Sequence, residues 1–330
     1  MQAAIYGLSG AALSADERRF FRDANPVGFI LFQRNCESPD QVRALVAELR
    51  HLVGRNDAPV LIDQEGGRVA RLKPPHWPAY PAPAVIAALG GIRAREAAWL
   101  GARLIADDLA QLGITVDCAP VVDIPIPGAD PVIGDRAWGA TPAAVATLGQ
   151  AVCDGLMAGG VLPVIKHIPG HGRGNVDSHK GLPVVTTDRA TLDSSDFAPF
   201  RALAAMPWAM TAHILYSAID PERPATLSPL VIDVIRTGIG FEGVLVSDDL
   251  SMQALGGSLQ ERARGALKAG CDLVLHCNGD GTEMSAIAAA VGPLTPSAAL
   301  RLSGAEARRQ APGNFDRVAA EWRFAALLAG

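Results

Sequence analysis

Apolar and polar positions along the chain follow two alternating patterns, one typical of strands and one typical of helices. Short apolar runs of four to six residues recur, and most are followed by a longer stretch with the helical spacing of apolar positions. We predict eight strands, at Ala3–Gly7, Val27–Phe32, Pro59–Ile62, Thr115–Ala119, Leu162–Lys166, Ala209–Ile214, Gly243–Ser247 and Asp272–His276. We predict helices at Pro39–Val53, Arg93–Leu112, Pro142–Ala158, Asp193–Ala205, Pro229–Gly238 and Leu259–Ala269. This alternation is typical of an α/β protein with a parallel sheet.

The number of strands favours a closed barrel over an open sheet. Eight strands within about 280 residues match a (β/α)₈ TIM barrel. The sequence contains no glycine-rich dinucleotide-binding fingerprint, which is the motif of a doubly wound sheet. No change in composition marks a second domain. We therefore predict a single TIM-barrel domain over residues 1–330, with a doubly wound sheet as the alternative fold.

Composition narrows the classes of protein. Hydrophobic residues make up 49% of the 330 residues and charged residues 19%, which is enough apolar material for a large core and excludes a disordered chain. The net charge of −5, without a cluster of Lys and Arg, argues against a nucleic-acid partner. Five scattered cysteines contain no CxxC pair, so we expect neither a zinc site nor a disulfide framework.

One segment, Ala202–Ile219, has no charged residue and is nearly as long as a membrane-spanning helix. It contains Pro207 and His213, and we interpret it as a helix end, a turn and a buried strand. The first residues lack a basic stretch followed by an apolar one, so we predict no signal peptide. We expect a cytoplasmic protein without a membrane partner.

Polar residues stand where several predicted strands end. One strand runs into Asp63, another into Lys166 and His167, a third carries His213, and a fourth ends in Asp248 and Asp249. In such barrels the functional site lies at the ends of the strands and in the loops that follow. The sequence therefore predicts one polar pocket at this end of the barrel.

The segment KHIPGHGRGNVDSHKGL, residues 166–182, contains three histidines and four glycines. A helical metal site is excluded because Pro169 and Gly170 separate the first two histidines, and the GxGxG spacing is a weak signal for a phosphate cradle. Asp177 and His179 are two residues apart, which lets a carboxylate orient an imidazole for general acid/base work. A hydrogen bond that only anchors the loop is the alternative. The glycines predict a mobile loop over residues 169–181.

The doublet Asp248-Asp249 follows strand geometry. Because neighbouring side chains of a strand point to opposite sides, we expect one carboxylate in the barrel mouth and the other outside it. A carboxylate beside Lys, Arg and His stays ionised and suits a nucleophile or a stabiliser of a cation.

These segments together resemble a known family. The chain is similar to the glycoside hydrolase family 3 β-N-acetylglucosaminidases, the single-domain bacterial type used in cell-wall recycling. The matching segments are DQEGGRVARL (63–72), APVVDI (119–124), IGDRAWG (133–139), KHIPGHGRGNVDSHKGLP (166–183), MTAHILY (210–216), PATLSP (224–229) and GVLVSDDLSMQAL (243–255). They occur in the family's order and span most of the chain.

The resemblance implies roles for eight residues. Asp248 looks like the catalytic nucleophile, and Asp177 with His179 looks like the acid/base dyad on a mobile loop. The residues that resemble the family's binding site for the terminal N-acetylglucosamine are Asp63, Arg71, Arg136, Lys166 and His167. The stretch Arg173–Asn175 receives no role.

The resemblance also implies an activity. We expect a retaining exo-β-N-acetylglucosaminidase that removes terminal N-acetylglucosamine from peptidoglycan-derived muropeptides, of the type linked to 1,6-anhydro-N-acetylmuramic acid. We expect a small-molecule carbohydrate substrate, no cofactor, no metal and a monomer. The alternatives are an N-acetylglucosaminide phosphorylase, a β-glucosidase of the same family and a non-catalytic sugar-binding protein. The phosphorylase needs the same residues, so the sequence leaves it open.

Overall fold

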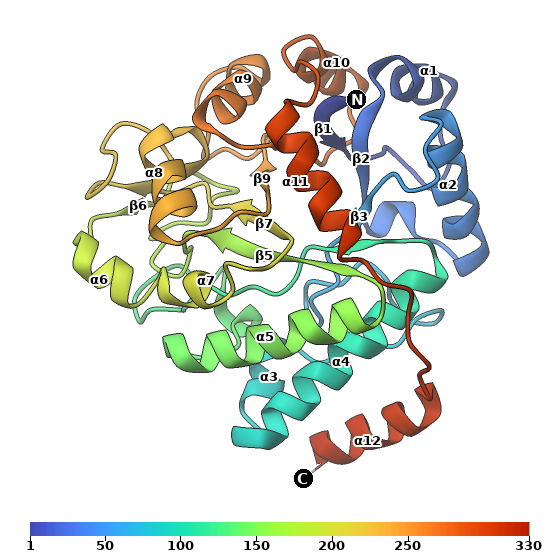
Figure 1. Ribbon diagram of the computed structural model, residues 1–330, viewed down its shortest axis with the longest axis vertical. Helices are drawn as coiled ribbons and strands as arrows, with labels where there is room; N and C mark the ends of the chain where they lie inside the picture. Colours follow the sequence, from blue (N-terminus) through green and yellow to red (C-terminus); the bar gives the residue numbers. More distant parts are fainter. Residues whose placement is uncertain (330) are drawn as a thin grey trace.

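The computed structural model describes residues 1–329 and contains the predicted barrel (Figure 1). Among these residues, eight parallel strands close in the order β1-β10-β9-β7-β5-β4-β3-β2. They are β1 (Gln2–Tyr6), β2 (Pro26–Leu31), β3 (Val60–Ile62), β4 (Val116–Asp117), β5 (Leu162–Ile168), β7 (Trp208–Thr211), β9 (Val244–Asp249) and β10 (Leu273–His276). Each coincides with a predicted strand to within a few residues. The (β/α)₈ fold is confirmed, and the doubly wound alternative is excluded because β1 pairs with β10.

Helices surround the barrel (Figure 1). The larger ones are α1 (Ala15–Ala24), α2 (Pro39–Leu52), α4 (Gly91–Gln111), α5 (Pro142–Ala158), α9 (Leu259–Ala269), α10 (Gly281–Ala288), α11 (Pro296–Ala307) and α12 (Arg317–Ala329). Ser38 and Thr141 cap α2 and α5, with proline in the first turn of each helix. α12 lies against α4 at the bottom of Figure 1, where Arg317 pairs with Asp107 and Asp108 of α4.

The helical layer differs from the prediction. Helices α1, α10, α11 and α12 were not predicted, and two of the predicted helices have another form. The helix expected at Asp193–Ala205 is two short helices, α6 (Arg189–Ser194) and α7 (Ala198–Ala202). α6 ends at its C-cap, Ser195, whose backbone N–H still donates to the carbonyl of Thr191. The Ser195 hydroxyl bonds the same carbonyl and the carboxylate of Asp196. The segment Pro229–Gly238 begins as α8 (Pro229–Asp233) and continues as a π-helical turn, η4 (Val234–Gly238).

Several small elements were not predicted. Two-residue strands β6 (Val184–Val185) and β8 (Leu215–Tyr216) pair in parallel outside the barrel. The other additions are the short helix α3 (Pro83–Ala87) and the 3₁₀ turns η1 (Gln33–Asn35), η2 (Gly134–Arg136) and η3 (Ala225–Leu227). Of these, η2 carries Arg136 to the end of the barrel where the functional site lies.

The uncharged segment 202–219 is folded into the barrel. α7 ends at Ala202, and the strands β7 and β8 follow within the segment, with Trp208 and Tyr216 buried. Within residues 1–329, the helices are all too short or too polar to cross a membrane.

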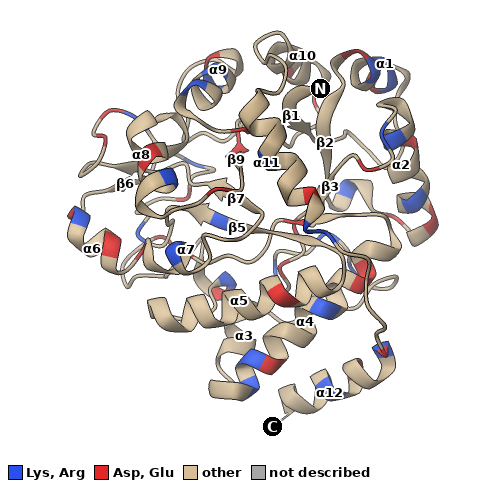
Figure 2. Cartoon of the chain, in the orientation of Figure 1, with Lys and Arg blue, Asp and Glu red and all other residues tan. Residues whose placement is uncertain are grey.

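The chain's charges are interspersed along the outer helices, where acidic and basic segments alternate (Figure 2). Inside the barrel the pattern differs, because β5 carries Lys166 and β9 ends in Asp248 and Asp249. Most other residues of these two strands are buried and apolar. These interior charges mark the carboxyl end of the barrel as the polar end.

Candidate active site

A cavity of about 270 Å³ opens at the carboxyl ends of the strands. Its walls come from the loops after β3, β4, β5, β9 and β10. All eight predicted site residues line it: Asp63, Arg71, Arg136, Lys166, His167, Asp177, His179 and Asp248. The volume lies just below the range of roughly 300–1,000 Å³ typical of small-molecule sites.

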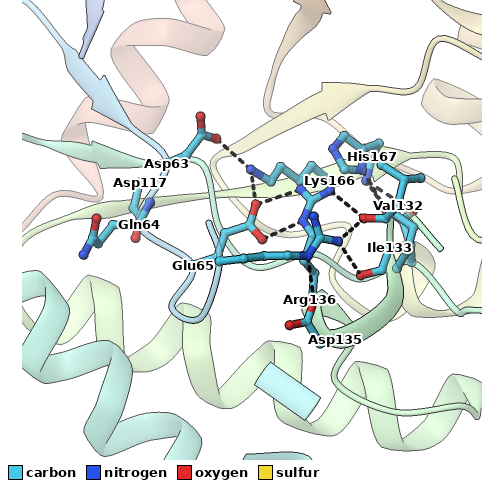
Figure 3. Close-up of polar contacts among 12 residues, drawn as sticks. Asp63, Gln64, Glu65, Asp117, Val132, Ile133, Asp135, Arg136, Lys166 and His167 are labelled. Atoms are coloured by element: carbon cyan, nitrogen blue, oxygen red, sulfur yellow. Dashed lines mark hydrogen bonds and ion pairs between the residues drawn. The ribbon is translucent and has the colours of Figure 1, made fainter. Parts of the chain in front are cut away.

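A lattice of buried ion pairs forms the wall made by the loop after β3. The Lys166 ammonium lies 2.8 Å from a carboxylate oxygen of Asp63 and 2.7 Å from one of Glu65 (Figure 3). Arg71 donates to the other oxygen of Asp63 at 2.9 Å, and Arg136 donates from Nε and Nη2 to the two carboxylate oxygens of Glu65. The bidentate contact fixes the plane of the guanidinium as well as its position.

These pairs keep every member of the lattice charged. Burial by itself raises the pKa of Glu65, but Arg136 and Lys166 outweigh it and lower that pKa to about 2. Lys166 and Arg71 likewise hold the pKa of Asp63 well below its ordinary value despite burial. Asp63 and Glu65 in turn raise the pKa of Lys166. The wall therefore presents fixed donors and acceptors to a ligand with hydroxyl groups.

His167 is held by Asp123, a buried residue after β4. The ring Nδ1–H donates to Asp123 Oδ2 at 2.7 Å, which leaves Nε2 as the ring nitrogen that faces the cavity. The backbone N–H of His167 also donates to the Asp123 carboxylate. Although Asp123 is buried, its contacts with His167 and His171 keep its pKa below the ordinary value.

The two carboxylates at the end of β9 have different surroundings, although both reach the cavity. Asp249 accepts hydrogen bonds from the backbone and hydroxyl of Ser251 and from the backbone of Cys277. Asp248 accepts a bond from the backbone N–H of Asp249. The expectation that only one of the two residues reaches the mouth was therefore wrong, since both line the cavity. The register of β9 against β10 shifts before Asp249, so strict alternation does not hold there.

Asp248 is an ionised carboxylate that has few hydrogen bonds to the protein. Burial raises its pKa, but His213, His167 and the backbone N–H of Asp249 outweigh this effect and hold it below the ordinary value. His213 does not point at a ligand, because its Nδ1 bonds the hydroxyl of Thr226 and its Nε2–H donates to the carbonyl of Asp249 at 3.0 Å. His213 thus fixes the backbone beside Asp248.

Asp177 and His179 form a hydrogen-bonded pair at the edge of the cavity. His179 Nδ1–H donates to Asp177 Oδ1 at 2.9 Å, and the His179 backbone N–H donates to the same oxygen. These bonds lower the pKa of Asp177 against the opposing effect of burial. The His179 side chain is 70% exposed, so its Nε2 is open to solvent and to a ligand.

The glycines of the predicted mobile loop serve close packing. A Cβ on Gly172 would lie 1.7 Å from the carbonyl oxygen of Ile124, and one on Gly174 would lie 3.1 Å from the His171 ring. Gly170 has a φ of +147°, which favours glycine. The segment 169–174 therefore packs tightly, and the part that carries Asp177 and His179 begins after it.

Sequence reasoning placed the predicted residues in one cavity but missed several partners. Glu65 shares the lattice with Asp63, Asp123 orients His167, and His171 contacts the segment that carries Asp177 and His179. His213, which the sequence analysis named at a strand end, supports β9 and is not among the residues that line the cavity. Glu65 and Asp123 lie inside matched segments, which was a signal that they belong to the site. Within residues 1–329, no three His, Cys, Asp or Glu side chains are grouped so as to hold a metal ion.

Comparisons with known proteins point to one class. Residues 4–304 match the glycosyl hydrolase family 3 N-terminal domain. The chain is 42% identical over 282 residues to a β-hexosaminidase of Alkalilimnicola ehrlichii, covering 83% of this chain and 80% of that one. It is similar in structure to NagZ from Neisseria gonorrhoeae, with a TM-score of 0.85, 32% identity and coverage of 99% and 96%. A family 3 β-N-acetylglucosaminidase from Paenibacillus sp. gives a TM-score of 0.82 and 34% identity over 99% of this chain, which spans 62% of that protein.

The barrel places a buried, ionised carboxylate and a His–Asp pair in one cavity of the size of a sugar. These are the groups that a glycoside hydrolase needs. The chain belongs to glycosyl hydrolase family 3. The predicted resemblance is confirmed, and so is the class of enzyme, since the relatives are β-hexosaminidases.

Proposed function

We propose that the chain is a retaining exo-β-N-acetylglucosaminidase that works through a covalent glycosyl–Asp248 intermediate. Asp248 attacks the anomeric carbon while His179 donates the Nε2 proton to the leaving oxygen. His179 then takes a proton from water, which hydrolyses the ester and returns Asp248 to its free form. The observation that carries this proposal is that Asp248, Asp177 and His179 line the same small cavity as the ion lattice.

The lattice supports a role in binding the terminal sugar. Asp63 offers acceptors to hydroxyl groups, while Arg71, Arg136, Lys166 and His167 offer donors around the same cavity. A site of about 270 Å³ accommodates one sugar ring better than a polymer segment, which supports exo cleavage. We assign these five residues to recognition of N-acetylglucosamine.

The proposed natural substrate is a muropeptide fragment in which N-acetylglucosamine is linked to 1,6-anhydro-N-acetylmuramic acid. The support is the resemblance of the matching segments to the single-domain bacterial type of the family, together with relatives named β-hexosaminidase. We propose that residues 1–330 act as one catalytic unit, as a monomer in the cytoplasm, where such fragments are recycled.

The experiment compares matched chromogenic N-acetylglucosaminide and glucoside substrates, with and without phosphate. A site built to bind a substrate group rejects an analogue that lacks it, by up to about 10⁴–10⁵-fold. We expect a strong preference for the N-acetylglucosaminide and free N-acetylglucosamine as the product under both conditions. Equal kcat/KM on both substrates would remove the assignment to N-acetyl sugars. A sugar phosphate as the product would instead identify a phosphorylase.

A further inference from the structure

His171 lies between the sugar-binding wall and the acid/base segment. It is buried, and its ring packs edge-on against that of His167, with the ring centres 5.5 Å apart. Its Nε2 shares a 3.2 Å hydrogen bond with the hydroxyl of Ser178. Its Nδ1 finds no hydrogen-bond partner among the described residues. The contact with Ser178 is therefore the hydrogen bond that the imidazole makes to the rest of the described chain.

Ser178 stands between the two members of the acid/base pair. Its side chain is buried, whereas its neighbour His179 is 70% exposed. The backbone carbonyl of Ser178 accepts a hydrogen bond from the backbone N–H of Ala254, in the loop after β9. The segment that carries Asp177 and His179 is thus attached at Ser178, on one side to His171 and on the other to the loop that follows Asp248.

The other end of this connection is the sugar-binding residue His167. Asp123 accepts the Nδ1–H of His167 at 2.7 Å and the backbone N–H of His171 at 2.6 Å. One buried carboxylate therefore orients the ring of His167 and fixes the backbone of His171. Gly174 lies close enough to the His171 ring that a Cβ there would be 3.1 Å from it. Buried charge and close packing leave the imidazole little freedom to change position.

We propose that His171 and Ser178 are positioning residues that set the place of the acid/base pair relative to the sugar subsite. The inference rests on the proposed function, in which His179 is the acid/base group. A proton donor misplaced by about 1 Å loses on the order of 10²-fold in rate, so an anchor beside His179 controls proton transfer without touching the substrate. Asp123 connects the anchor at His171 to the sugar subsite, because it bonds both the backbone of His171 and the ring of His167.

The test uses His171→Phe and Ser178→Ala with two N-acetylglucosaminides, one with a phenol that leaves easily and one with an alcohol that leaves poorly. Phenylalanine keeps a buried ring and removes the bond to Ser178. We expect each variant to lower kcat/KM for the poor leaving group by about 10–100-fold, because that substrate needs the proton. We expect the activated phenol to lose less than about threefold.

The double variant measures whether the two side chains act through each other. We expect His171→Phe with Ser178→Ala to cost no more than either change alone, because both remove the same bond. Ser195→Ala is the matched control. Ser195 accepts a bond from Arg173 of the same loop at 3.2 Å and does not contact the dyad segment, so the ratio of the two substrates should not change.

Two results would overturn the inference. One is equal loss on both substrates in His171→Phe and Ser178→Ala, which indicates general loosening of the fold. The other is additive loss in the double variant. His179→Ala separates this inference from the proposed function: if it also slows both substrates equally, the acid role of His179 fails. If His179→Ala shows the leaving-group split and the other two variants do not, only the positioning role fails.

Discussion

At the residue scale, the histidines of the site differ by what their ring nitrogens contact. His213 uses both nitrogens within the protein, and burial lowers its pKa. Burial and the neighbouring His167 lower the pKa of His171 to about 4, so it is neutral at physiological pH. His179 has one nitrogen on Asp177 and the other open to solvent. Exposure and one carboxylate partner distinguish the histidine suited to proton transfer from those suited to structure.

The adjacent residues Asp248 and Asp249 give a prediction at this scale. Asp248→Asn should lower kcat by on the order of 10⁴-fold or more, because the nucleophile is lost, and should leave thermal stability nearly unchanged. Asp249→Asn should retain far more activity and lower the melting temperature, because its carboxylate holds Ser251 and the backbone of Cys277. Steady-state kinetics and thermal unfolding of both variants check this. Similar rates in the two variants would refute the assignment of Asp248.

At the element scale, the sequence predicts those elements whose buried residues form a continuous apolar run. The eight barrel strands are apolar runs, so their positions follow from the sequence. β6 and β8 have two residues each, too few for a periodic signal. The helix expected at Asp193–Ala205 is interrupted after Ser195, the C-cap of α6, and apolar spacing does not show such a local helix end.

The site was predictable as a set of residues and not as a set of contacts. The end of each strand located Asp63, Lys166, His167 and Asp248. The partners Asp123 and Glu65 escaped because each acts on residues far along the chain: 44 residues separate Asp123 from His167. The loop glycines predicted mobility, whereas at Gly172 and Gly174 they make room for Ile124 and His171. The sequence alone does not distinguish a glycine that makes a loop mobile from a glycine that permits close packing.

The loop after β5 gives a prediction for its two halves. The backbone amides of His171 and Gly174 are bonded within the tightly packed half, to Asp123 and to the His171 carbonyl. We expect slow hydrogen exchange at these amides and faster exchange over residues 176–181, which slows when a sugar is bound. Hydrogen exchange followed by mass spectrometry measures this. Slow exchange throughout 176–181 in the free protein would contradict a mobile acid/base segment.

At the scale of the whole molecule, the ion lattice couples function to stability. Asp63, Glu65, Lys166, Arg71 and Arg136 join the loops after β3 and β4 to β5 inside the barrel. Outside it, Arg317 ties α12 to α4 through Asp107 and Asp108. Removing one partner of a buried pair leaves an uncompensated charge and costs roughly 3–5 kcal/mol. The groups proposed to bind sugar therefore also hold the polar end of the barrel together.

The lattice predicts how stability depends on pH. Glu65 has an ordinary pKa of 4.5 and one of about 2 in the folded protein, so its stabilising effect is complete above about pH 4.5 and is lost as the pH falls toward 2. Glu65→Gln should lower the free energy of unfolding by roughly 3–5 kcal/mol at pH 7, and the difference from wild type should shrink below pH 4. Urea unfolding of both proteins between pH 7 and pH 3 measures the difference. A constant difference across that range would contradict the lowered pKa.

The central claim is that Asp248 forms a covalent bond to the sugar. The most direct measurement is rapid quenching of the enzyme during turnover of an N-acetylglucosaminide with an easily leaving phenol, followed by mass spectrometry of its peptides. We use the variant His179→Ala, in which the second step slows because water is no longer deprotonated, so the intermediate accumulates. The account predicts one N-acetylhexosaminyl group on the peptide that contains Asp248, and none when Asp248→Asn is added. An unmodified peptide during turnover, as expected if the substrate's own acetamido group were the nucleophile, or a sugar on another residue, would contradict it.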